Sequence, residues 1–338
     1  MSPSRRSAVL RMILGLTISG LLLVLLLRTI DSEEVTRTLQ EVNTGVLASL
    51  LLLHLIILIL RVHRWQLIVE PIPPRSWRDR IVTGEAMFVG WFTDSALPLK
   101  AGELTRPWVY ATRRGRSFVD VLGTVVLERL LDLLTLFALF TIAFAVLPGA
   151  AVPDWFATSA WAGAGLTAVG LVCTLALFRW GPRTLSPSTE DFSGLRTKLL
   201  ATLVHFRRGL EIFKNPFRTV QVLGWTVGIW TLETVALSWT LIACGAPFSG
   251  PTDPSALAAS ASQVVFSTLA VVLPQSPAGI GVDQWATILA LRPFGIESST
   301  ATAVSIIDVT CVLFWVLPLG IIALLRNSSI GSKPQQDH

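Results

Sequence analysis

The sequence predicts an all-α polytopic membrane protein, and three observations predict this fold class. Of the 338 residues, 52% are hydrophobic and only 14% are charged, whereas a soluble domain carries about 25% charged residues. Long apolar stretches recur along the chain, each close to the roughly 20 residues that a helix needs to cross a bilayer. Two further apolar stretches are broken in the middle by prolines and glycines.

Six stretches are predicted to be full spans: 10–28, 45–62, 119–147, 157–178, 219–244 and 301–325. The first follows three arginines and lacks a small-residue cleavage site, so we expect an uncleaved span rather than a signal peptide. Together they predict one transmembrane domain over 1–326, with halves of about 8–148 and 155–326. The polar residues 327–338 are predicted to form a disordered cytoplasmic tail.

The two broken stretches, 81–104 and 256–292, are interrupted at Leu97-Pro98 to Gly102 and at Leu273-Pro274 to Gly281. A break exposed to lipid would leave backbone groups unpaired, at several kcal/mol each, so it must be buried in protein or line a cavity. We predict that each stretch is a re-entrant hairpin of two arms. The alternative is that each makes one or two complete crossings.

The positions of the basic residues set the predicted orientation. With a cytoplasmic N-terminus and two re-entrant hairpins, most of the 27 Lys and Arg, including Arg61 and Arg64, fall in cytoplasmic stretches, as the positive-inside bias requires. Both termini are then cytoplasmic, in a cell (inner) membrane. The two halves form an inverted-topology repeat whose hairpin tips meet near the midplane. The cytoplasmic loop 179–218 has helical apolar spacing, which predicts an amphipathic helix on the leaflet or a soluble connector helix.

The first break carries a candidate anion site. A helix starting at Gly102 would direct free N–H groups and the positive end of its dipole toward an anion. Lys100 and Arg106 would add positive charge, with Glu103 beside them. A phosphate head group is the predicted ligand. The alternative is that Arg106 is a topological anchor paired with Glu103.

Glu128, Arg129 and Asp132 lie inside the predicted span 119–147. Charges at this depth are unfavourable by about 2.5–3.5 kcal/mol each unless paired or hydrated, so they must face the protein interior. Glu128 and Asp132 share a helix face, and Arg129 is spaced to pair with Asp132. The set has a net charge of minus one and needs a further cation, Arg106 or Lys100. If the set is functional, it is a counter-charge for the substrate or a proton relay. The alternative is that it is structural and clamps a hairpin.

The second break and the last span supply further candidates for head-group binding: Gln275, Ser276, Gly279, Gly281, Asp283 and Asp308. Intramembrane acids are functional candidates by default; Glu233, Glu85 and Asp94 are weaker ones. The chain has no nucleophile triad, phosphate-binding glycine loop, His-x-x-His or Cys-x-x-Cys motif. We therefore expect no metal, no cofactor, no nucleic acid and no enzymatic activity.

Four motifs follow one another along the chain: Leu97-Pro98-x-x-x-Gly102-Glu103-x-x-Arg106, Glu128-Arg129-x-x-Asp132, Leu273-Pro274-x-Ser276-Pro277-x-Gly279-x-Gly281 and Phe294-Gly295. In their order and spacing the chain resembles the flippase-like family of the lysylphosphatidylglycerol synthase transmembrane region. The resemblance covers about residues 10–325. It implies lipid translocation without identifying the lipid. We expect no soluble aminoacyl-transfer domain after residue 325, so synthase activity is not implied. Asp94-Ser95 and Asp308 depart from the family's usual Asn pair and last-span Arg.

The predicted function is translocation of an anionic or phosphate-linked lipid between leaflets through a polar midplane cavity. The predicted partners are membrane lipids with anionic head groups, and a lipid-modifying enzyme is a further candidate. Two alternatives remain open. The chain is a membrane-embedded transferase acting on a lipid-linked phosphate, or a non-catalytic partner of a lipid-modifying enzyme.

Overall fold

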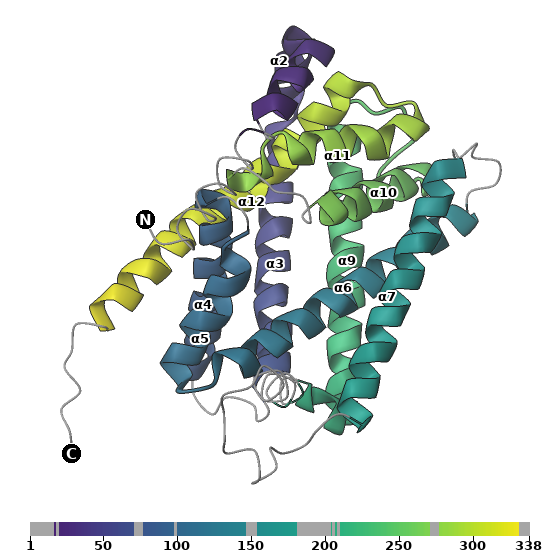
Figure 1. Cartoon of the computed structure of the whole chain (residues 1–338). Helices are drawn as coiled ribbons and strands as arrows, with labels where there is room; N and C mark the ends of the chain where they lie inside the picture. Colours follow the sequence, from purple (N-terminus) through teal and green to yellow (C-terminus); the bar gives the residue numbers. More distant parts are fainter. Residues whose placement is uncertain are drawn as a thin grey trace, which may run out of the picture.

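A computed structural model describes residues 17, 20–70, 77–97, 100–146, 154–180, 204, 207, 210–270 and 277–330 (Figure 1). These residues form helices and turns without a strand. The labelled helices are α2 (Ser32–Glu41), α3 (Thr44–Val69), α4 (Trp77–Ala96), α5 (Gly102–Arg114), α6 (Phe118–Val146), α7 (Asp154–Trp180), α9 (Pro216–Ala243), α10 (Pro254–Ala270), α11 (Val282–Leu291) and α12 (Ser298–Ile330). Gly20–Thr29, which overlaps the first predicted span, is helical too. Short 3-10 turns cover Glu211–Lys214, Pro277–Gly279 and Arg292–Phe294.

The predicted all-helical membrane fold is confirmed. Among the residues that the structure describes, three helices are long and apolar enough to cross a bilayer: Thr44–Val69, Pro216–Ala243 and Ser298–Asn327. Helices α6 and α7 are of similar length, with 29 and 27 residues, which at 1.5 Å per residue is about 40 Å. The count of six full spans stays a prediction.

Two long helices, α3 and α9, run antiparallel through the centre of the molecule (Figure 1) and pack against each other. Both begin at an asparagine cap. The Asn43 side chain accepts the Gly45 N–H at 2.7 Å, and the Asn215 side chain accepts the Arg218 N–H at 3.2 Å. These bonds satisfy amide donors that the first turn of a helix leaves unpaired.

Both predicted breaks are real breaks between helices. The first separates α4 from α5 and the second separates α10 from α11, and each pair packs together as a hairpin. The two arms of the first hairpin pack closely at Gly90. A Cβ added there would lie only 2.8 Å from the Cβ of Arg106. In the second, Gly279 and Gly281 have φ values of 71° and 88°, which glycine adopts readily. The predicted residues Gln275 and Ser276 lie outside the described residues.

The two hairpins enter the helix bundle from opposite ends. In sequence, α4 follows the end of α3, and α10 follows the end of the antiparallel α9. Their tips nevertheless approach each other, because α4 contacts the Pro277–Gly279 turn of the second hairpin.

The helix contacts of one half are repeated in the other. If α3, α4, α5 and α6 correspond to α9, α10, α11 and α12, then the contact of α4 with α12 corresponds to that of α10 with α6. The contacts of α5 with α6 and of α3 with α4 likewise correspond to those of α11 with α12 and of α9 with α10. The central contact joins α3 to α9, the two helices that correspond to each other. The two sets of four helices therefore pack through matching pairs of contacts.

The predicted amphipathic helix of loop 179–218 lies mostly outside the described residues. At its end, Leu210 and Ile212 are buried in an apolar cluster with Ile68, Leu127, Leu131 and Val222. This part of the loop packs on the helix bundle.

Candidate functional site

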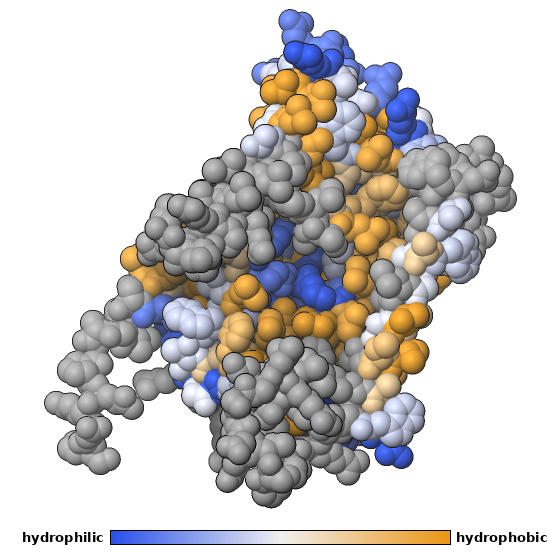
Figure 2. Space-filling model, in the orientation of Figure 1, coloured by the Kyte–Doolittle hydropathy of each residue, from blue (hydrophilic) through white to orange (hydrophobic). Residues whose placement is uncertain are grey.

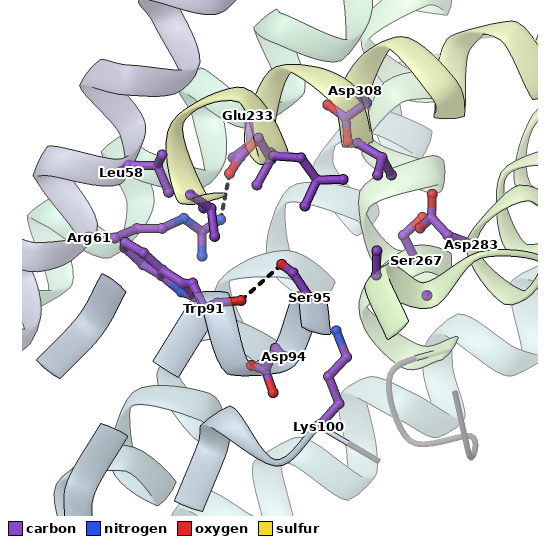
Figure 3. Close-up of a pocket in the computed structure, with 16 residues that line it drawn as sticks. Leu58, Arg61, Trp91, Asp94, Ser95, Lys100, Glu233, Ser267, Asp283 and Asp308 are labelled. Carbon is purple, nitrogen blue, oxygen red and sulfur yellow. Dashed lines mark hydrogen bonds and ion pairs between the residues drawn. The ribbon is translucent and has the colours of Figure 1, made fainter. Parts of the chain in front are cut away.

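A cavity of about 280 Å³, lined by both charged and apolar side chains, lies where the two hairpin tips meet (Figure 3). The first tip contributes Asp94, Ser95 and Lys100, and the second contributes Ser267, Gly279 and Asp283; α3, α9 and α12 complete the wall with Arg61, Glu233 and Asp308. Small-molecule sites usually enclose about 300–1,000 Å³, so the volume suits a compact polar group. Figure 2 shows hydrophilic residues at mid-height on one face, surrounded by hydrophobic surface.

Lys100 supplies a cation to the first tip. Its backbone has φ 51°, and its side chain extends into the space between the tips (Figure 3). Within the described ranges, Lys100 makes no ion pair. The predicted anion site at the start of α5 is partly filled from within, since the Gly102 N–H donates to Asp94 Oδ1 at 2.7 Å. Lys100, rather than the helix terminus, is therefore the group open to an anion.

The other charged groups of the cavity wall have partners. Arg61 Nη2 lies 2.5 Å from Glu233 Oε1, and the two residues occupy equivalent positions along α3 and α9. Ser305 donates to Asp283 Oδ2 at 2.6 Å. Asp308 Oδ1 lies 3.0 Å from His54 Nε2. Carboxylates thus outnumber the cations Arg61 and Lys100 among the described lining residues.

A second charged cluster is buried apart from the cavity. The Arg64 guanidinium lies between two acids of α6, with Nη2 at 2.6 Å from Glu128 Oε1 and Nη1 against Asp132. Arg106 Nη2 lies 2.7 Å from Glu128 Oε2, and its guanidinium stacks 4.7 Å from the centre of the Trp65 ring. The Trp230 indole N–H donates to Asp132 at 2.8 Å. The cluster thereby joins α3, α5, α6 and α9.

This part of the structure corrects the expected place of Arg64 and Arg61. Arg64 is fully buried among the helices and does not lie in a loop, because α3 continues to Val69, well past the predicted span 45–62. Arg61, placed in the same stretch, is half-buried and paired with Glu233. The expected pair of Arg129 with Asp132 is present at 3.8 Å, and Arg129, whose side chain is 40% exposed, lies at the same distance from Glu128 and Glu103.

The predicted site residues therefore separate into two groups. Lys100, Gly279, Asp283 and Asp308 line the cavity. Arg106, Glu128 and Asp132 form the buried cluster with Arg64, and Glu103 and Arg129 lie at its edge. Gly102 and Gly281 shape the starts of α5 and α11. Arg106 was expected to pair with Glu103 or to bind a head group, but it is 4% exposed and bound to Glu128.

Sequence reasoning missed His54, Arg61 and Arg64 as site residues. Arg61 and Arg64 follow an apolar run and resemble flanking topology signals. The signal that would have found them is the surplus of intramembrane acids, since each buried carboxylate requires a partner. Within the described ranges, no cluster of three or more His, Cys, Asp or Glu side chains is placed to hold a metal.

The comparison with curated proteins corrects the expectation that the chain is not an enzyme. The chain is 24% identical over 324 residues to a protein named Glycosyltransferase AglD, from Haloferax volcanii. That match covers 87% of this chain and 51% of the relative, so the chain spans about half the length of the curated relative it matches. A relationship to a protein with an enzyme's name removes the basis for excluding an enzymatic role.

No solved structure matches the chain. A family model does: the model of the lysylphosphatidylglycerol synthase TM region matches residues 12–320, nearly the whole chain. A transmembrane-region family agrees with the apolar helices described above. The chain belongs to the lysylphosphatidylglycerol synthase transmembrane-region family of membrane proteins.

Proposed function

We propose that this protein moves a phosphate-linked lipid between the two leaflets of its membrane, and that the head group passes through the cavity between the hairpin tips. The observation that carries the proposal is Lys100, a cation without an ion pair among the described residues, at the meeting point of two broken helices. Interrupted helices in two related halves are typical of transporter binding sites.

The chemistry of the cavity suits a head group with both an anion and hydrogen-bond donors. A phosphate would lie against Lys100, where a charge-assisted hydrogen bond replaces its hydration. Hydroxyl or amine groups of the same head group would lie against Asp94, Asp283 or Asp308. We assign head-group contact to these residues, and a supporting role to Arg106, Glu128 and Asp132.

The same proposal includes the membrane topology. We propose that the α4–α5 and α10–α11 hairpins are re-entrant from opposite sides, within one transmembrane domain that is an inverted repeat with both termini cytoplasmic. The repeated helix contacts and the opposite entry of the hairpins support this arrangement. Relative movement of the two halves about the α3–α9 contact would then open the cavity alternately to each side.

A second candidate rests on the glycosyltransferase relative. In this alternative the cavity holds a lipid-linked phosphate while a sugar is transferred to or from it. It predicts a chemically altered lipid after incubation with a sugar donor, whereas translocation leaves the lipid unchanged.

The test of translocation is leaflet exchange of a fluorescent phosphatidylglycerol or polyprenyl phosphate in proteoliposomes. We expect Lys100→Gln to slow exchange by about 10- to 100-fold, since a hydrogen bond to a charged group contributes about 1.5–3 kcal/mol. Lys100→Arg should retain most of the activity, and Arg37→Ala, an exposed change on α2, should match wild type. Equal exchange in Lys100→Gln and wild type would refute the assignment.

A further inference from the structure

His54 and Asp308 form a pair at the cavity wall, and their hydrogen bonds show how many protons the pair carries. His54 lies on α3 and is 2% exposed, and Asp308 on α12 lines the cavity with 27% of its side chain exposed. His54 Nδ1 lies 2.8 Å from the carbonyl oxygen of Leu50, and Nε2 lies 3.0 Å from Asp308 Oδ1. Both ring nitrogens therefore face oxygen atoms.

These contacts require more protons than a neutral histidine beside a carboxylate can supply. A carbonyl oxygen only accepts, so the Nδ1 atom must carry a hydrogen to bond Leu50. A neutral imidazole then has a bare Nε2, whose lone pair would face a carboxylate oxygen. The short Nε2 to Oδ1 contact is favourable only if Nε2 is also protonated or if Asp308 carries the proton.

The charged groups around the pair determine how loss of this proton changes the charge of the cavity wall. Three titratable groups face the pair: Glu233 on α9, Cys311 on α12 and Asp283 on α11. The same cavity is also lined by Asp94 and Lys100 of the first tip and by Arg61 of α3. Carboxylates predominate in this set. Loss of the shared proton would add one more negative charge to the wall that faces Lys100.

We infer that the His54–Asp308 pair is a proton-binding site that couples protonation to the cavity. With the proton bound, the α3–α12 bridge is intact and the cavity is less negative. Without it, the bridge breaks and the extra negative charge repels an anionic head group. The coupling part rests on the proposed lipid transport, whereas the proton site itself does not.

The proton site is tested without transport by ¹⁵N NMR of the full chain labelled at histidine, in nanodiscs at about pH 7, in the range where histidine normally titrates. His54→Gln identifies the His54 signals among those of the four histidines. We expect Nε2 of His54 to be protonated or hydrogen-bonded in wild type, and Asp308→Ala to convert it to an ordinary neutral ring nitrogen. A bare Nε2 in wild type, or spectra unchanged by Asp308→Ala, would overturn the proton site.

The coupling is tested by leaflet exchange at about pH 6 and about pH 8. Wild-type exchange of an anionic phospholipid should fall by up to about tenfold for each pH unit above the midpoint at which the pair loses its proton. In Asp308→Asn, which cannot lose a proton there, the pH dependence should disappear. A pH-independent wild type, with the NMR result positive, overturns the coupling. Absence of exchange at every pH overturns the transport proposal and leaves the NMR result to decide the proton site.

Discussion

At the scale of single residues, the buried Arg64 holds together the acids that the sequence placed inside the membrane. It is fully buried between Glu128 and Asp132, and removing one partner of such a group leaves an uncompensated buried charge. We expect Arg64→Ala to reduce the free energy of unfolding by about 3–5 kcal/mol. Thermal unfolding in detergent would measure this change.

Arg129 is the matched control for Arg64. It lies on the same acids at 3.8 Å, but its side chain is 40% exposed. Exposed ion pairs contribute about 0–1 kcal/mol, so Arg129→Ala should leave stability nearly unchanged. Equal losses in Arg64→Ala and Arg129→Ala would contradict the arrangement of the cluster.

The Arg61–Glu233 pair at the cavity wall offers a reciprocal test. Arg61→Glu places two acids together and should lower stability, as should Glu233→Arg with two cations. The double exchange restores opposite charges, so a double-mutant cycle should give a coupling of about 0.5–3 kcal/mol. Additive losses in the cycle would mean that the two side chains are not paired.

At the scale of helices, close packing of α4 on α5 depends on Gly90. A Cβ there would lie 2.8 Å from Arg106 Cβ and 3.2 Å from the carbonyl oxygen of Gly102, so the hairpin must open to accept it. We expect Gly90→Ala to destabilise the protein by about 1–3 kcal/mol. Gly224→Ala on α9, where nothing lies within 4 Å, should be neutral or stabilising by up to about 1 kcal/mol. Thermal unfolding of the two variants, compared side by side, decides this.

The sequence predicted the helix breaks but not the partners of the buried charges. Pro98 and Gly102 act locally on the backbone, so the helix break that they cause can be predicted from the sequence alone. Arg64 and Glu128 are 64 residues apart in the chain, and their pairing depends on how α3 packs on α6. The same limitation affected Arg106 and Lys100: both follow the first break, but only the packing of α5 shows that Arg106 turns inward and Lys100 toward the cavity.

At the scale of the whole molecule, re-entrant hairpins predict which chain segments share a side of the membrane. In a Cys173→Ser background, Arg80→Cys and Thr112→Cys should react with an impermeant thiol reagent from one side. Thr252→Cys and Glu297→Cys should react from the other. All four positions are exposed in the structure. If either hairpin crosses the membrane once, its two positions will be labelled from opposite sides.

The account depends most on the location of the head group, and photo-crosslinking tests it directly. Wild-type protein in nanodiscs would be irradiated with a phosphatidylglycerol analogue that carries a photoreactive head group, and the modified peptides identified by mass spectrometry. We predict adducts on the two hairpin tips, around Lys100 and Asp283, that an excess of unlabelled lipid removes. Adducts confined to the outer apolar helix faces, with none at the tips, would contradict passage of the head group through the cavity.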